Sequence, residues 1–177
     1  MKLLKGITLT MSLLLTVPAL MIAQDNWDNQ PDVVDIAISS EAHTTLVAAV
    51  KAADLVSTLK SDGPFTVFAP TNAAFEALPE GTVPALLKPE NKEKLTAILT
   101  YHVVPGKLDA AAVTKAIKAG NGMATVKTVQ GGELTAYTKD GNVYLKDENG
   151  NEAQVTAVDL EGSNGVVHVI NAVVTPK

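Results

Sequence analysis

Two nearly continuous apolar blocks, about a hundred residues apart, constrain the fold of this chain more than any other feature. The first block spans residues 65–75 and the second spans residues 164–176. Apolar runs without polar alternation are typical of strands that are buried on both faces. Two such strands so far apart in sequence predict one domain closed by its own distant segments, with Val67 and Val169 in the same interior.

The first 23 residues have the pattern of a secretory signal peptide. Lys2 and Lys5 form a positive start, and residues 7–22 are rich in apolar side chains and carry no charge. A membrane anchor is the alternative, but the run is shorter than the roughly 20 residues of a spanning helix. We expect cleavage near Ala23 and a secreted or periplasmic protein with no membrane span after cleavage.

The remaining chain is divided into a linker and one domain. Residues 24–31 are polar apart from Trp27, which indicates a linker whose tryptophan docks on the domain or stays exposed. Residues 32–176 then form a single domain, which is long enough to bury most of its apolar surface.

Composition limits the classes of partner. The chain carries 14 basic residues, all of them lysine, against 19 acidic residues, and its net charge is −5 at pH 7. Because arginine supplies most bidentate phosphate contacts, nucleic acid and anionic membranes are not expected partners. The chain has no cysteine, so packing rather than disulfides must stabilise it, which favours a bacterial envelope origin.

Helical spacing in the first half gives way to alternation in the second half. Amphipathic helices are predicted from residues 32, 42, 72, 82, 89 and 109, with Asn72 and Asp109 as caps. Residues 101–104 are predicted to form a short strand, closed by Pro105-Gly106. From Met123 onward, apolar and polar residues alternate, and the pairs at 140–141 (Asp-Gly) and 149–150 (Asn-Gly) predict hairpins. The expected class is α+β, with N-terminal helices packed on a small antiparallel β-sandwich.

Three pieces of the chain resemble the fasciclin-like (FAS1) domain family. They are residues 45–50 leading into 66–75, residues 99–106 with a central Tyr-His pair, and residues 164–171. The motif positions within these pieces are Thr66, Phe68, Pro70, Thr71, Asn72, Phe75, His168 and Asn171. The resemblance covers about residues 32–176 and implies a secreted, single-domain bacterial member that works by contact, in cell adhesion or matrix interaction.

The resemblance also implies two binding stretches. Animal members are credited with integrin binding around a Tyr-His pair, which is Tyr101-His102 here, and around an Asp-Ile dipeptide before the last block. Asp159-Leu160 stands where that dipeptide would be, and the flanking residues 161–163 differ. Read from the residues alone, this segment is either an exposed recognition edge or a turn formed by Asp159 with Leu160 in the core.

Catalytic and metal-binding patterns are weak. His102 and His168 lie amid apolar residues and are expected to be core histidines with hydrogen-bond partners, whereas His43 at a helix start is expected to be exposed. An Asp-x-Asn-x-Asn run from Asp147 resembles the start of a calcium loop but lacks the glycine and the final glutamate that such a loop needs. No cysteine nucleophile or Gly-x-Ser-x-Gly motif is present. We therefore expect no metal, no cofactor and no enzyme.

The sequence favours a non-catalytic interaction module for adhesion or for contact with envelope or matrix. Its partner would be a protein or a surface polysaccharide, and weak self-association is possible. Two alternatives stay open. A carrier of an apolar small molecule needs a cavity of a few hundred cubic ångströms. A hydrolase with a dispersed Ser-His-Asp site needs a serine within hydrogen-bond reach of a histidine.

Overall fold

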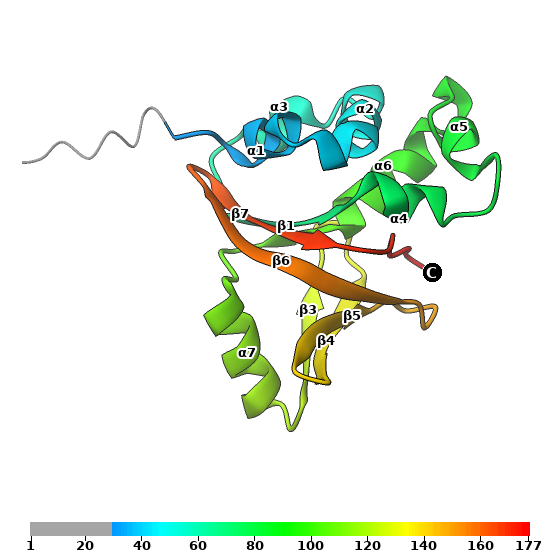
Figure 1. Cartoon of the computed structure of the whole chain (residues 1–177). Coiled ribbons are helices and arrows are strands. Elements are labelled where there is room, and N and C mark those ends of the chain that lie inside the picture. The colour runs from blue at the N-terminus through cyan, green and yellow to red at the C-terminus, as the bar shows by residue number, and fades with distance from the viewer. Residues whose placement is uncertain (1–29) are drawn as a thin grey trace, which may run out of the picture.

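The computed structural model describes residues 30–177. The predicted signal peptide and most of the predicted linker, with Trp27, lie outside the described residues. Helices form a layer above the sheet, and a further helix, α7, lies below it (Figure 1). The class is therefore α+β, as predicted.

One mixed sheet of seven strands, in the order β2-β1-β7-β6-β5-β4-β3, replaces the expected small antiparallel sandwich. β1 (Phe65–Pro70) pairs in parallel with β7 (Gly165–Ile170), with Val67 opposite Val167. The prediction that the two apolar blocks share one interior is thus confirmed. The expectation of a purely antiparallel arrangement is wrong, because the two buried strands of this pair run in the same direction.

The helices of the upper layer precede and follow β1 in the chain. They are α1 (Val33–Ser39), η2 (Glu41–His43), α2 (Thr44–Ala52), α3 (Val56–Leu59), α4 (Asn72–Glu76), α5 (Thr82–Leu86), η3 (Pro89–Asn91) and α6 (Lys92–Tyr101). Asp32 caps α1, since its carboxylate accepts hydrogen bonds from the backbone N–H groups of Val34 and Asp35. Among residues 30–177 no single helix is long and apolar enough to span a membrane; a bent pair, Val33–Ser39 with Glu41–Ala52, meets that test only jointly, across a 104° break.

The second half of the chain is the predicted meander. β2 (Val103–Pro105) leads to α7 (Ala110–Ala119), and β3 (Met123–Lys127), β4 (Glu133–Lys139), β5 (Asn142–Lys146) and β6 (Glu152–Gly162) follow. Both predicted hairpins are confirmed: β4 and β5 meet at 140–141, and β5 and β6 meet around 149–150. β6 is longer than the others, and it pairs with β5 at one end and with β7 along the rest.

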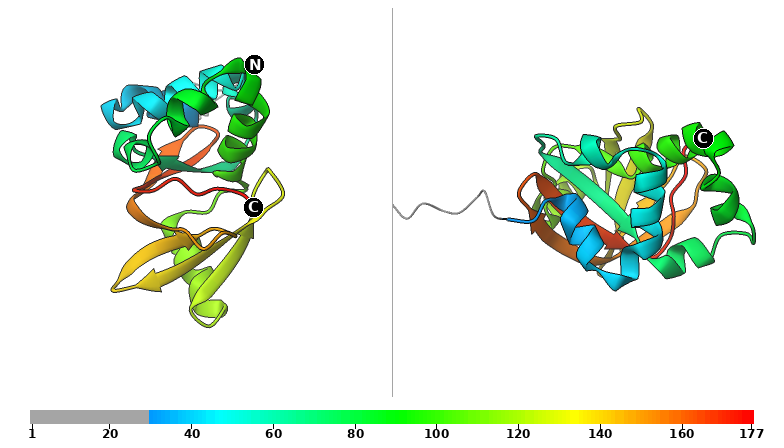
Figure 2. Two further views of the ribbon diagram at one scale, coloured as in Figure 1. Left: turned by 90° about the vertical axis from the view of Figure 1, so that its right-hand side faces the viewer. Right: turned by 90° about the horizontal axis from the view of Figure 1, so that it is seen from above.

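Two apolar cores lie on opposite sides of β1 and β7. The upper core joins the helices to the sheet through residues such as Leu46, Leu99 and Val167. The lower core lies among α7, the meander and Phe68, and it includes Leu134 and Leu145. The left view of Figure 2 shows the helical layer above the central strands and the meander below them.

Two local predictions differ from the structure. Thr71, not Asn72, caps α4, because the Thr71 hydroxyl accepts a hydrogen bond from Ala74 N. The expected strand over residues 101–104 is also wrong: Tyr101 ends α6, His102 is the residue after that helix, and only Val103 begins β2. The apolar run there extends across a helix end and a strand start, so its hydropathy alone does not mark the boundary.

Candidate functional site

Tyr101 and His102 have buried side chains. They are 0 % and 2 % exposed, respectively. The Tyr101 hydroxyl donates to Glu133 O at 2.6 Å and accepts from Glu148 N at 3.3 Å. Burial raises the Tyr101 pKa to about 12, since the phenolate would lose its hydration. A partner that meets the described surface therefore contacts neither side chain directly.

His102 joins the end of α6 to the C-terminal segment. Because a carbonyl can only accept, His102 Nδ1–H donates to Ile98 O at 2.8 Å, which leaves Nε2 to accept from Val174 N at 3.3 Å. Burial lowers the pKa of His102 to about 4, because the interior disfavours the imidazolium. The ring is thus neutral at pH 7, with both nitrogens engaged by backbone groups.

Asp159 and Leu160 lie within β6 rather than in a loop before the last strand. Asp159 has a φ of 58° and interrupts the regular pairing of β6 with β7. Its carboxylate accepts from Ala110 N at 2.7 Å, at the first residue of α7, where an acidic side chain is electrostatically favourable. Leu160 is 38 % exposed. The pair is at the surface, and its aspartate ties β6 to α7.

The predicted motif residues of the two central strands connect neighbouring segments. The Thr66 hydroxyl donates to Gly106 O at 2.6 Å and accepts from Leu108 N at 2.8 Å. His168 donates from Nε2 to Leu108 O at 2.7 Å, accepts weakly from Asp159 N, and stacks on Phe68 with ring centres 5.7 Å apart. Both residues thus hold the segment that leads into α7.

The other motif residues have structural contacts as well. Asn72 Oδ1 accepts from Thr45 N at 3.0 Å, and its Nδ2 donates to Glu41 O at 2.9 Å, so it joins α4 to the start of α2. Asn171 Oδ1 accepts from Gln154 N at 2.8 Å and extends the β6–β7 pairing. Pro70 ends β1, and Phe75 is buried in the upper core.

Asp147 is a buried acid with a structural role that its sequence pattern does not indicate. It is 5 % exposed, and its carboxylate accepts from the backbone N–H groups of Asn149, Asn151 and Thr175. Burial opposes the charge, but these hydrogen bonds and that from the Asn151 side chain hold the pKa of Asp147 below its usual value. The Asp-x-Asn-x-Asn run is therefore a loop that binds the chain's own C-terminal segment.

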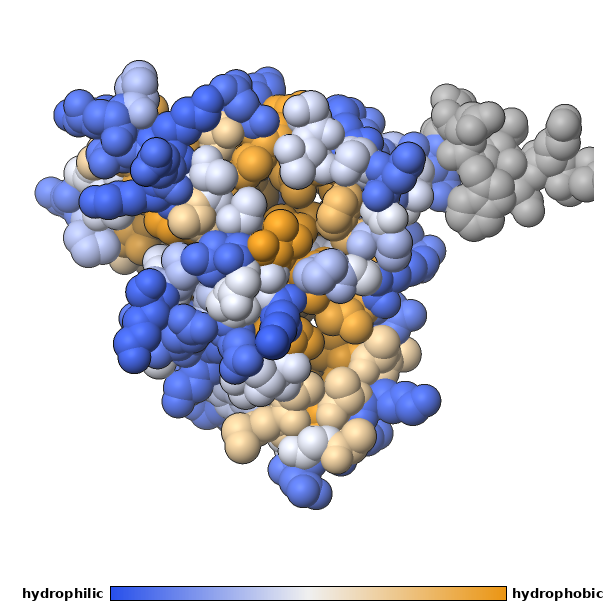
Figure 3. All heavy atoms as spheres, turned by 180° about the vertical axis from the view of Figure 1, so that it is seen from behind, coloured by the Kyte–Doolittle hydropathy of each residue, from blue (hydrophilic) through white to orange (hydrophobic). Residues whose placement is uncertain are grey.

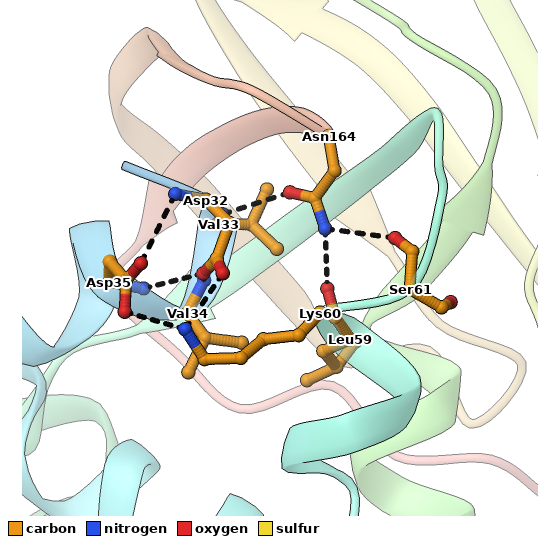
Figure 4. Close-up of polar contacts among 8 residues, drawn as sticks. All are labelled: Asp32, Val33, Val34, Asp35, Leu59, Lys60, Ser61 and Asn164. Carbon is orange, nitrogen blue, oxygen red and sulfur yellow. Dashed lines mark hydrogen bonds and ion pairs between the residues drawn. The ribbon is translucent and has the colours of Figure 1, made fainter. Parts of the chain in front are cut away.

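A second polar cluster ties α1 to the turn between β6 and β7 (Figure 4). Asn164 Oδ1 accepts from Val33 N at 3.0 Å, and Asn164 Nδ2 donates to Leu59 O at 2.7 Å and to Ser61 O at 3.1 Å. Lys60 Nζ lies 2.7 Å from carboxylate oxygens of both Asp32 and Asp35. Segments more than a hundred residues apart meet here, so the cluster is a structural clasp.

His43 is buried rather than exposed, at 4 %, and this corrects the prediction from its position. Its Nδ1 lies 2.8 Å from Ser40 Oγ, which is the serine–histidine proximity that a hydrolase requires. The pair is local, three residues apart. Burial lowers the pKa of His43, and its Nε2 has no hydrogen-bond partner among the described residues. No carboxylate among residues 30–177 hydrogen-bonds to the ring, and neither Ser40 nor His43 lines the apolar cavity between the helical layer and β1.

An apolar cavity lies between the helical layer and β1. Its lining includes Val34, Leu46, Val50, Phe68 and His102, and Figure 3 shows apolar residues at the surface between the upper helices, seen from behind. The cavity has a volume of about 40 Å³, whereas ligand pockets usually measure about 300–1,000 Å³. The cavity is too small for a carried ligand in this conformation. Within residues 30–177 no group of three or more His, Asp or Glu side chains is arranged to hold a metal ion.

Comparisons with known proteins agree with this architecture. The Fasciclin domain family matches residues 41–176. The chain is 49 % identical over 161 residues to "Protein sll1483" of Synechocystis sp., covering 91 % of this chain and 82 % of the relative. It is 40 % identical over 151 residues to "Immunogenic protein MPB70" of Mycobacterium bovis, covering 82 % of this chain and 69 % of the relative.

Two further matches are to parts of longer proteins. "Transforming growth factor-beta-induced protein ig-h3" of Sus scrofa is 36 % identical over 144 residues, which is 81 % of this chain and 19 % of that protein. The fold matches a FAS1 domain pair from the insect cell adhesion molecule fasciclin I, with a TM-score of 0.71 at 16 % identity, over 80 % of this chain and 50 % of the other. With a family match over most of its length and a matching fold, the chain belongs to the fasciclin domain family.

Proposed function

We propose that this protein is an exported, non-catalytic interaction module that makes adhesive contact with an envelope or matrix surface. The observation that carries the proposal is that one fasciclin domain accounts for residues 41–176 of the 177. A structural relative with this fold is named as an insect cell adhesion molecule. Proteins of this kind act through a rigid outer surface, and here two tied cores supply the rigidity.

The placement of the buried polar groups supports this role. His102, His168 and Asp147 hydrogen-bond to backbone groups of distant segments. Groups committed in this way stabilise the fold and are not free for proton transfer to a substrate. Adhesion then depends on exposed residues, and a single domain gives weak contacts that gain strength only when many copies meet a repetitive partner.

A binding assay on beads tests the proposal. Beads that carry the purified protein at high density should retain bacterial envelope fragments in a saturable way, and beads that carry the heat-unfolded protein should not. Equal retention by the two kinds of bead would overturn the proposal. Hydrolysis of p-nitrophenyl acetate that is lost in Ser40→Ala would instead favour the hydrolase suggested by the Ser40–His43 contact.

A further inference from the structure

An aromatic row crosses the outer face of the meander. In the strand pairing, Met123 of β3 lies opposite Tyr137 of β4, Tyr137 lies opposite Tyr144 of β5, and Tyr144 lies opposite Gln154 of β6. Residues directly opposite in antiparallel strands project to the same side of a sheet. Four strands therefore present one continuous row: methionine, two tyrosines and glutamine.

This row is on the solvent side of the sheet. The alternate residues of β4 and β5, such as Leu134, Ala136 and Leu145, are buried in the lower core, so the row faces away from that core. In the left view of Figure 2, the yellow and gold strands of the lower half face the viewer with no helix in front of them. Met123 is 60 % exposed and both tyrosines are half-buried. The face is open to a partner.

The two tyrosines form a stacked pair. Their ring centres are 5.7 Å apart, with 26° between the ring planes. The chain contains only three tyrosines, and its aromatic content is 4 %, so two of them side by side on one exposed face is a marked concentration. Tyrosine combines an apolar ring with a polar tip and so suits a partner that is apolar on its faces and polar at its edges.

Polar residues surround the pair, and their charges nearly balance. Lys139 Nζ lies 3.9 Å from a Glu152 carboxylate oxygen and 5.7 Å from the centre of the Tyr144 ring. Lys127 lies opposite Glu133, and Lys146 lies opposite Glu152, in the strand pairing. On a chain with a net charge of −5, this locally balanced face neither attracts nor repels a charged polymer strongly. It suits a neutral partner that forms hydrogen bonds.

We propose that this face binds a neutral polysaccharide with a flat, ribbon-like chain, of the β-1,4-linked glucose type. The sugar rings lie across the outer edges of the stacked Tyr137 and Tyr144 rings and against Met123, and the Gln154 amide exchanges hydrogen bonds with sugar hydroxyls. This inference rests on the proposed adhesive function and identifies the chemical class of the binding partner.

A polysaccharide partner also compensates for the small contact area of the tyrosine pair. One stacked pair offers a small contact area and weak affinity. A polymer repeats the same sugar face along its length, so many copies of the protein bind one chain, and a protein anchored on a surface gains avidity.

Affinity electrophoresis and calorimetry test the inference. In native gels that contain hydroxyethylcellulose, the protein should migrate more slowly than in plain gels. Cellohexaose should release heat on binding. Dextran, whose chain is not a flat ribbon, should neither slow the protein in native gels nor release heat. The variant with both Tyr137→Ala and Tyr144→Ala should lose affinity at least tenfold. The matched Tyr144→Phe variant, which keeps the ring, should stay within about threefold of the unmodified protein.

Two controls separate a binding defect from a folding defect. Ile38→Ala and Val129→Ala remove exposed apolar side chains from other places and should leave polysaccharide binding unchanged. Thermal melts of every variant show whether the fold persists. The inference is overturned if neither glucan probe is bound, if the double alanine variant binds as the unmodified protein does, or if light scattering shows that the tyrosines hold a dimer. None of these results changes the expected outcome of the bead assay. The proposed adhesive role and the proposed polysaccharide partner can therefore be disproved separately.

Discussion

At the scale of single residues, the polar side chains of the interior act as cross-links between distant segments. His102 binds the backbone of α6 and of the C-terminal segment, and Asp147 binds Thr175 of that same segment. A buried polar group that loses its partner costs about 1–3 kcal/mol. Each of these residues therefore makes the last residues of the chain depend on segments that are folded elsewhere.

His102 gives the protein a defined sensitivity to acid. Its pKa falls from 6.5 to about 4 on folding, so the unfolded chain binds more protons than the folded chain between these values. The stability from the neutral ring is complete above about pH 6.5 and declines as the pH falls toward 4, by about 3 kcal/mol in all. Urea unfolding of the unmodified protein at pH 7 and pH 4.5 should show this decline.

The matched variant is His102→Gln, whose side chain does not titrate. It should be less stable at pH 7, because glutamine does not reproduce both ring contacts, and its stability should fall less between pH 7 and pH 4.5. An unchanged slope would mean that another group, such as the buried His43, causes the acid sensitivity.

At the scale of elements, the clasp of Figure 4 holds α1 against the rest of the fold. α1 has seven residues, which is too short for a helix to be stable alone in water. Asn164 accepts a hydrogen bond from Val33 N and donates two more, to the last residue of α3 and to Ser61 beyond it. The helix is thus stabilised by a residue that follows it by more than 120 positions.

Removing this side chain should release α1 selectively. In Asn164→Ala, the buried N–H of Val33 loses its acceptor, so we expect a loss of about 1–3 kcal/mol. Amide hydrogen exchange in α1 should be faster, with little change in β4 and β5. Ser163→Ala is the matched control, since Ser163 contacts Pro31 only through its backbone N–H. Equal exchange in both variants would contradict the role of Asn164.

Local sequence patterns predicted most of the helices and strands, but they did not predict which distant strands pair with each other. The hairpin at 140–141 also fixes the opposition of Tyr137 and Tyr144, because both residues lie three positions from that turn; this aromatic pair could have been found from the sequence. The near-continuous apolar runs of β1 and β7 fit a parallel pair, but they fit the core of an antiparallel sandwich equally well, so the sequence did not decide the direction of pairing. The burial of His43 and Asp147 depends on segments far away in the chain, which hydropathy does not report.

At the scale of the whole molecule, β1 and β7 belong to both cores. Val67 and Val167 contribute to the upper core, and Phe68 and Ile170 contribute to the lower core. The C-terminal segment repeats this pattern, with Val173 in the upper core and Val174 in the lower. Because consecutive residues point to opposite sides, neither core can be disrupted without disturbing the backbone that lines the other.

The two cores should therefore unfold together. Leu99→Ala in the upper core and Leu145→Ala in the lower core each remove a buried side chain, and each should cost about 2–5 kcal/mol. Native-state hydrogen exchange at rising urea concentration should give the slowest amides of α6 and of β4 the same unfolding free energy. Both variants should lower that shared value equally in the two elements. If Leu145→Ala lowered the value in β4 alone, or if limited proteolysis near Gly122 released two stable fragments, the helical layer and the meander would be separate folding units and not one domain.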